Sequence, residues 1–174
     1  MSTYRDAIIY FKNLAISNVD IAHLDQEGKK KFFRMDMTEF YTGTIAQLPP
    51  ADQGPFMILF NYIIDFKKID CLNKQKQFMF MILQAYEHDN WQNEEDALNY
   101  CEEVIIEVIN KINADSQTYA DIDFLYGGFS FDNVRIIPTD KIRNASGSFI
   151  GWQCSFFLNE RVPTAINPDK WITP

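Results

Sequence analysis

Hydrophobic residues between positions 93 and 113 recur at steps of three and four, which is the spacing of one face of an α-helix. The residues that share this face are Ala97, Leu98, Cys101, Val104, Ile105, Val108, Ile109 and Ile112. Asn93 is suited to cap the amino end of this helix, and Asp96 can reach back to an unpaired amide. The pattern predicts a helix over residues 93–113 that buries one face, and we expect a sheet to be its partner.

A second amphipathic segment covers residues 4–16 near the start of the chain. Thr3 and Asp6 have the spacing of a capping box, and apolar residues share one face of the predicted helix. Residues 17–31 lose this pattern, because polar residues and a glycine dominate there. We therefore predict a helix followed by a loop.

Residues 32–43 fit two descriptions. Apolar residues alternate from position 33 to position 37 as in a strand, but the spacing over the whole segment also fits a helix. Asp36 and Glu39 have the spacing of a capping box. On balance the segment favours a short helix at residues 37–41, with the strand as the alternative.

Four segments have the pattern of β-strands. Residues 56–67 begin as a continuous apolar run and pair naturally with residues 78–86, so we predict a hairpin with a polar connection. Residues 134–138 form a short predicted strand. The clearest alternation of apolar and polar residues in the chain lies at residues 149–158.

Two hairpins around a long helix predict an α+β fold: a mainly antiparallel sheet packed against the long central helix and the N-terminal helix. We expect the helices on one face of this sheet. Residues 1–160 are predicted to form one domain. Residues 161–174 contain three prolines and are predicted to form an extended C-terminal arm.

Composition and charge narrow the class of protein. The chain has 174 residues, is 47% apolar and carries a formal net charge of −8, so it can bury a core and should be repelled by nucleic acid. Residues 4–14 do not resemble a secretion signal, because Arg5, Asp6 and Lys12 interrupt them, so we expect none. The longest nearly apolar run, residues 56–64, is too short to cross a membrane. Three cysteines without metal-type spacing are most simply explained by a reduced, intracellular protein.

The sequence offers little catalytic chemistry. Both histidines, His23 and His88, lack a second histidine at the spacing of metal ligands, and a structural role is the expected one for each. The chain contains no phosphate-binding glycine loop and no nucleophile motif. We therefore expect no enzymatic activity, no metal and no cofactor. The alternative is a small-ligand-binding or enzymatic α+β domain with a site near His88.

Aromatic residues placed outside the predicted core faces suggest protein–protein contact, or else satellite clusters packed over the sheet. Ile106 lies among polar residues on the outer side of the central helix, where it is either covered by the N-terminal region or part of a subunit contact. The residues that we predict for an interface are Ile106, Tyr119, Phe124, Tyr126, Phe129 and Trp171.

The order of these elements resembles that of the tail-terminator (tail-completion) proteins of long-tailed bacteriophages and prophages. The resemblance rests on the segments TYRDAIIYFKNL, KKFFRMDMTEFYTG, GPFMILFNYIIDF, the central helix and FIGWQCSFFL. The last of these contains Gly-Trp-x-x-x-Phe. Related neck and baseplate proteins have similar small α+β folds.

The resemblance implies a non-enzymatic virion protein that forms a homo-oligomeric ring, usually of six subunits, at the end of the tail or the head–tail junction. It implies tail-tube and neck proteins as partners, while the acidic net charge and the short apolar run lead us to expect no direct nucleic-acid or membrane binding. The implied location is the virion, or the host cytoplasm during assembly. The implied ring contacts lie in residues 17–31, 115–132 and 161–174.

Overall fold

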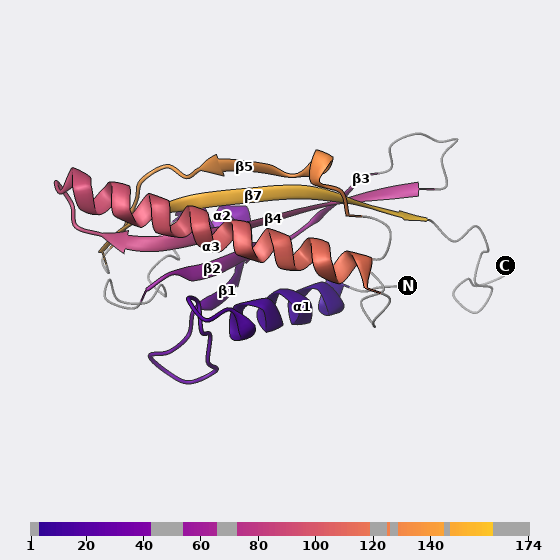
Figure 1. Cartoon of the computed structure of the whole chain (residues 1–174), viewed down its shortest axis with the longest axis horizontal. Helices are drawn as coiled ribbons and strands as arrows, with labels where there is room; N and C mark the ends of the chain where they lie inside the picture. Colours follow the sequence, from indigo (N-terminus) through magenta and orange to yellow (C-terminus); the bar gives the residue numbers. More distant parts are fainter. Residues whose placement is uncertain are drawn as a thin grey trace, which may run out of the picture.

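The computed structural model describes residues 4–42, 54–65, 73–118, 125, 129–144 and 147–161. The elements in chain order are α1 (Tyr4–Ser17), β1 (Phe32–Met35), α2 (Met37–Thr42), β2 (Phe56–Phe60), β3 (Ile63–Asp65), β4 (Asn73–Tyr86), α3 (Trp91–Gln117), the 3-10 turn η2 (Phe131–Asn133), β5 (Arg135–Pro138), β6 (Ile142–Asn144) and β7 (Gly147–Arg161). This arrangement confirms the predicted α+β class (Figure 1).

The seven strands of the described residues belong to one sheet, whose main path runs β1-β2-β4-β7-β5. At its centre lies the antiparallel pair β4 and β7. The two strands stay in register from Asn73 opposite Arg161 to Tyr86 opposite Ser148. Strand β3 pairs with β4 beyond the end of β2, and β6 pairs with β7 beyond the end of β5. The sheet is therefore mainly antiparallel, as predicted, with β1 and β2 as a parallel pair.

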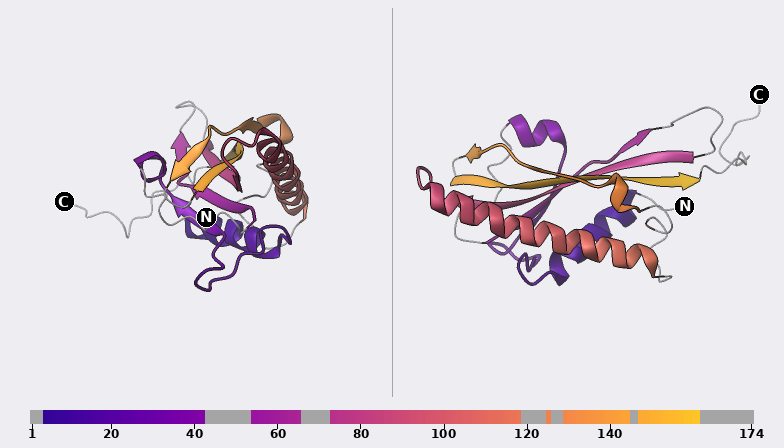
Figure 2. Two further views of the ribbon diagram at one scale, coloured as in Figure 1. Left: turned by 90° about the vertical axis from the view of Figure 1, so that its left-hand side faces the viewer. Right: turned by 45° about the horizontal axis from the view of Figure 1, so that its top comes forward.

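Helices α1 and α3 cover the same face of this sheet (Figure 2). Phe11 of α1 is fully buried, and its ring lies 5.6 Å from that of Phe80 and 6.4 Å from that of Phe156. The inner side of α3 contacts β4 and β7, which are the two central strands. The residues of α3 buried there are Ala97, Cys101, Val104, Ile105, Val108, Ile109 and Ile112. This set repeats the face predicted from the sequence, with Leu98 partly buried beside it.

The opposite face of the sheet has an apolar cluster of its own, which includes α2. Phe40 of α2 packs edge-on against Phe60 of β2, with ring centroids 5.4 Å apart. Strand β2 is buried on both faces for this reason. The expectation that helices would pack on only one face was therefore wrong, because short α2 packs on the other.

Helix α3 is longer at both ends than predicted. It begins at Trp91, and Asn90 rather than Asn93 is the N-cap, since the Asn90 side chain accepts the N–H of Asn93. Asn93 instead accepts the N–H of Glu87 at 2.6 Å, which joins the helix start to the end of β4. Asn90 and Asn93 both suit an N-cap. Because Asn93 bonds to Glu87 instead, Asn90 is the residue that caps the helix.

Residues 32–42 contain both elements that the sequence left open. Asp36 accepts the N–H of Glu39 at 2.7 Å and Glu39 accepts the N–H of Asp36 at 3.0 Å, so the predicted capping box is confirmed. The short helix is α2. The strand is β1, which the favoured prediction missed. Four residues cannot hold a strand alone, and β1 forms because β2 pairs with it in parallel.

The remaining boundaries differ modestly from the predictions. Residues 56–67 were predicted as one strand, but the chain leaves the strand at Asn61 and Tyr62, between β2 and β3. The polar segment before the last strand contains β6. The predicted arm lies outside the described residues apart from Arg161, which ends β7. Within the described ranges, no helix is long and apolar enough to cross a membrane.

Candidate functional site

The outer side of α3 is acidic and exposed. It carries five exposed carboxylates, namely Glu95, Asp96, Glu102, Glu103 and Glu107. None of the five has an ion-pair partner among the described residues. Like charges three or four positions apart on a helix repel each other weakly. The face therefore carries a local excess of negative charge that no ion pair among the described residues balances.

Ile106 lies within this acidic face and is 43% exposed. At 100° per residue it falls between Glu102 and Glu103 around the helix. The N-terminal region packs along the other flank of α3, where Tyr100 donates a hydrogen bond to Asp20 at 2.8 Å. Ile106 is thus an apolar side chain left in water by the protomer, and we call it, with the five carboxylates, the outer α3 face.

Of the other predicted interface residues, only Phe129 lies within the described part of the chain. Phe129 is half-buried, with its ring 5.4 Å from that of Phe156 and 5.8 Å from that of Phe131. It therefore packs within the chain, while its neighbour Phe131 is exposed. The contact residues outside the described ranges stay a prediction, and they are Tyr119, Phe124, Tyr126 and Trp171.

Two exposed arginines that the sequence did not single out lie on β5 and β6. Arg135 and Arg143 are exposed, and neither has an ion-pair partner among the described residues. Ile137 beside them is 36% exposed. In sequence these residues are separated by a proline and polar residues and show no pattern. The β7 partners of Arg135 and Arg143 are an odd number of positions apart, so Arg135 and Ile137 lie on one face of the sheet and Arg143 lies on the other.

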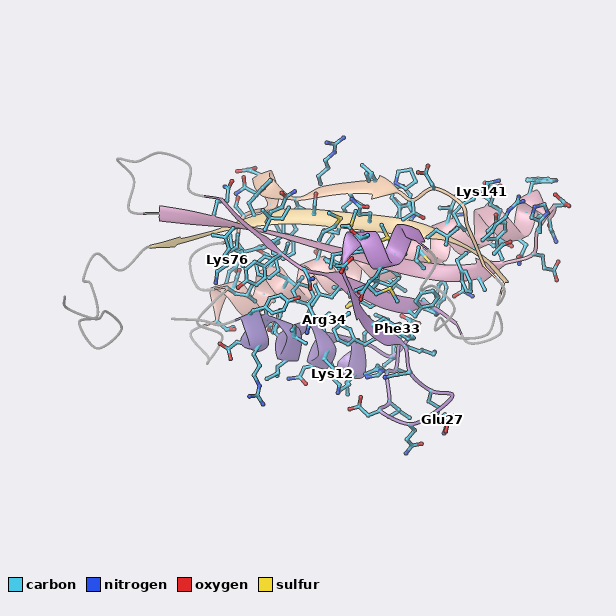
Figure 3. The ribbon with its side chains drawn as sticks, turned by 180° about the vertical axis from the view of Figure 1, so that it is seen from behind. Lys12, Glu27, Phe33, Arg34, Lys76 and Lys141 are labelled. Carbon is cyan, nitrogen blue, oxygen red and sulfur yellow. The ribbon has the colours of Figure 1, made fainter. Side chains whose placement is uncertain are left out.

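A polar pocket of about 210 Å³ lies beside His88, where β4 ends and α3 begins. Its lining residues are Tyr86, His88, Asp89, Asn90, Trp91, Glu94, Lys141 and Arg143. His88 Nδ1 lies 2.7 Å from Asp89 Oδ1. Lys141 Nζ lies 2.6 Å from Glu94 Oε2, and this hydrogen bond raises the pKa of Lys141. Figure 3 shows Lys141 at the end of the molecule where α3 begins.

This pocket has two features suited to holding a ligand. The Tyr86 hydroxyl is buried and has no hydrogen-bond partner among the described residues, and the Trp91 side chain at the rim is 74% exposed. Its charged residues are otherwise mostly paired with one another. None of the lining residues is a serine, threonine or cysteine that could act as a nucleophile. Across the described ranges, no group of three or more His, Cys, Asp or Glu residues is placed to hold a metal.

His23 is a structural residue, as the sequence favoured. Its ring is 1% exposed, and Nδ1 accepts the backbone N–H groups of Lys31 at 3.0 Å and Phe32 at 3.3 Å. Nε2 lies 3.3 Å from Asp25 Oδ1. The proton therefore belongs on Nε2 of a neutral ring. Desolvation lowers the pKa of His23, and Asp25 partly opposes this shift. The ring fixes the loop between α1 and the start of β1.

Cys101 and Cys154 are buried packing residues rather than reactive thiols. Burial raises the pKa of each thiol to about 12, so thiolate is scarce at neutral pH. Cys71 lies outside the described residues.

No protein-family model matches this chain, and a comparison with curated proteins finds no match either. The resemblance to tail-terminator proteins therefore stays a prediction. The function has to be argued from the surfaces and the pocket.

Proposed function

We propose that this protein is a non-enzymatic structural component that assembles into a ring at the tail end or head–tail junction of a phage or prophage particle. The observation that carries the proposal is the outer α3 face. It combines an exposed apolar side chain with carboxylates that have no partner among the described residues. A basic or apolar surface of another subunit would relieve the repulsion and cover Ile106.

The fold suits such a role for a mechanical reason. Helix α3 is held along its inner side by the two longest strands, β4 and β7. Trp152 also donates its indole N–H to the carbonyl oxygen of Leu98 at 2.9 Å. A face fixed in this way can meet a partner with little loss of conformational entropy. Protein–protein contact, rather than chemistry, is what this rigid surface supports best.

The proposal is tested by measuring the mass of the purified protein with multi-angle light scattering and imaging it in negative stain. The sample is measured alone and with a tail-tube protein encoded in the same genome, because assembly can require that partner. We expect ring-shaped particles in at least one of the two samples. A strict monomer at high concentration, without rings in either sample, would contradict the proposal.

The pocket beside His88 supports a second candidate, the binding of a small ligand. The observation in its favour is the buried Tyr86 hydroxyl, which has no partner within the described residues. A ligand bound there should change the fluorescence of Trp91, which lies at the rim. Titration with small carboxylates and phosphates, compared between the wild type and Trp91→Phe, tests this candidate. An identical response in both proteins would remove its support.

A further inference from the structure

Two lining residues of the pocket beside His88 come from strands on either side of β7. Tyr86 of β4 stands opposite Ser148 of β7, and Arg143 of β6 stands opposite the same serine. Residues directly opposite each other on paired strands lie on the same face of a sheet. Tyr86 belongs to one apolar cluster with Ala97 of α3, so this is the face that α3 covers. Tyr86 and Arg143 therefore lie on the same face of the sheet as α3, and both line the pocket at its start.

The ion pairs of the pocket leave one cation over. Lys141 Nζ lies 2.6 Å from Glu94 Oε2, and His88 Nδ1 lies 2.7 Å from Asp89 Oδ1. Arg143 has no ion-pair partner among the described residues. The hydrogen bond to Glu94 raises the pKa of Lys141, while the nearby charge of Arg143 opposes that shift. Arg143 is thus the charged group at this pocket that can still pair with an anion.

Two further features of the pocket favour a negatively charged acceptor. Helix α3 begins at Trp91, and the positive end of its dipole lies at the pocket. Tyr86 is only 7% exposed, and its hydroxyl is buried without a hydrogen-bond partner among the described residues. A buried hydroxyl without a partner is unfavourable, so an acceptor that reaches it gains free energy. The hydroxyl, the helix start and Arg143 all suit the same kind of group, an oxyanion.

Size and charge narrow the class of oxyanion. The pocket volume of about 210 Å³ is below the range of roughly 300–1,000 Å³ that is usual for drug-sized ligands, which indicates a small molecule. A phosphate group carries a charge of about −1.5 to −2 at neutral pH, whereas a carboxylate carries a single charge that matches one unpaired arginine. At the rim, the largely exposed ring of Trp91 offers a flat apolar surface.

We propose that this pocket binds a small monocarboxylic acid that carries an apolar or aromatic group. The carboxylate accepts hydrogen bonds from the Arg143 guanidinium and the Tyr86 hydroxyl, next to the positive end of α3. The apolar group packs against Trp91. This inference rests on the second function proposed above, the binding of a small ligand, and adds the chemical class of that ligand. It does not depend on ring assembly.

Three small probes test the class by isothermal titration calorimetry of the full chain. Benzoate has both a carboxylate and a flat ring, benzamide has nearly the same shape without the charge, and inorganic phosphate has the charge without the ring. We expect benzoate to bind at least about tenfold more tightly than either of the others, because only benzoate satisfies both Arg143 and Trp91.

Two substitutions test the residues assigned to the carboxylate. Arg143→Gln removes the positive charge and the paired N–H donors, so benzoate should bind at least about tenfold more weakly. Tyr86→Phe removes only the hydroxyl and should weaken benzoate binding about two- to tenfold. Thermal unfolding of each variant without ligand separates a loss of binding from a loss of structure.

Arg135→Gln is the matched control. Arg135 is also an exposed arginine without an ion-pair partner among the described residues, but its register with Ser155 places it on the opposite face of the sheet. This variant should bind benzoate like the wild type. An equal loss of binding in Arg135→Gln and Arg143→Gln would mean that the net charge of the protein, rather than the pocket, attracts the anion, and would overturn the proposal.

The remaining outcomes separate the class of ligand from the binding function. If benzamide or phosphate binds as tightly as benzoate, the carboxylate class is wrong while small-ligand binding stands. If benzoate binds equally well to the wild type and to Arg143→Gln, the assignment of Arg143 is wrong. If none of the three probes binds at millimolar concentration, both this inference and the small-ligand candidate fail.

Discussion

The two sides of α3 differ in how much of each the rest of the protein covers. The inner side is an uninterrupted apolar surface, and each of its buried residues packs between α3 and the sheet. The outer side has an isoleucine in water and five carboxylates without partners among the described residues. Folding explains the inner side, and we propose that a second subunit covers the outer side.

The largest contrast is expected from aspartate placed on each side in turn. Ile105 is fully buried and Ile106 is exposed, although they are adjacent in sequence. Ile105→Asp buries a charge without a partner and should lower the free energy of unfolding by about 4 kcal/mol or more. Ile106→Asp should change it by less than about 0.5 kcal/mol. Urea denaturation of both variants measures the difference. Unfolding by Ile106→Asp would show that the outer side is covered within the chain.

Gly151→Ala is expected to have the next largest effect, on the face of the sheet away from α3, where Gly151 stands opposite Leu83 of β4. An added Cβ would lie 2.0 Å from the carbonyl oxygen of Ile82, which is backbone and cannot move aside. We expect a loss of about 3 kcal/mol in the free energy of unfolding. Thermal unfolding followed by circular dichroism measures this loss.

Gly28→Ala is the control for Gly151→Ala. Gly28 has a φ of +76° and nothing within 4 Å of an added Cβ, so only backbone strain of about 1–2 kcal/mol is expected there. Equal losses in the two variants would mean that close packing at Gly151 is unimportant.

A smaller, pH-dependent effect is expected from His23, beside α1. Burial lowers the pKa of His23 below 6.5, so the folded protein keeps the ring neutral where the unfolded chain protonates it. The unfolded state then binds more protons, and stability falls as the pH falls through 6.5 toward the folded pKa. Equilibrium unfolding between pH 8 and pH 5 should show this loss.

His23→Asn separates this effect from other titrations. The Asn side-chain oxygen can take the place of Nδ1 as the acceptor of the two backbone N–H groups but does not titrate. The loss of stability over this pH range should be smaller in His23→Asn. The same loss in the variant and the wild type would assign it to other groups.

The smallest effect is expected from Tyr86→Phe, at the end of β4 where α3 begins. The Tyr86 hydroxyl is buried without a partner among the described residues, so its removal should leave stability unchanged or raise it by about 1 kcal/mol. Urea denaturation measures this change. A clear loss of stability would mean that the hydroxyl already has a bonding partner in the free protein, which would remove the observation on which the ligand-binding candidate rests.

Local patterns in the sequence were sufficient to predict the elements whose periodicity or residue spacing is distinctive. The buried side of α3, the strand at residues 149–158 and the capping box of Asp36 and Glu39 all follow from periodicity and spacing. Strand β1 could not be predicted as confidently, because only its parallel neighbour β2 distinguishes it from a helix. The sequence placed the N-cap at Asn93, but the Asn93 side chain accepts the N–H of Glu87 at the end of β4 instead. The spacing of residues along the chain gave no sign of this hydrogen bond.

The candidate interface was only half visible in the sequence. Ile106 stood out because it breaks the polar pattern of its helix face. The five carboxylates around it gave no signal, since whether they have ion-pair partners among the described residues depends on the fold.

The most direct test of self-assembly through the outer α3 face is the mass of the wild type compared with that of Ile106→Asp. Both are measured by light scattering across a concentration series, with and without the tail-tube protein. We expect the wild type to reach a multiple of its 20.3 kDa protomer mass, and the folded variant to remain at 20.3 kDa. A wild type that stays at the protomer mass in every sample, or a variant that assembles equally well, would contradict the account.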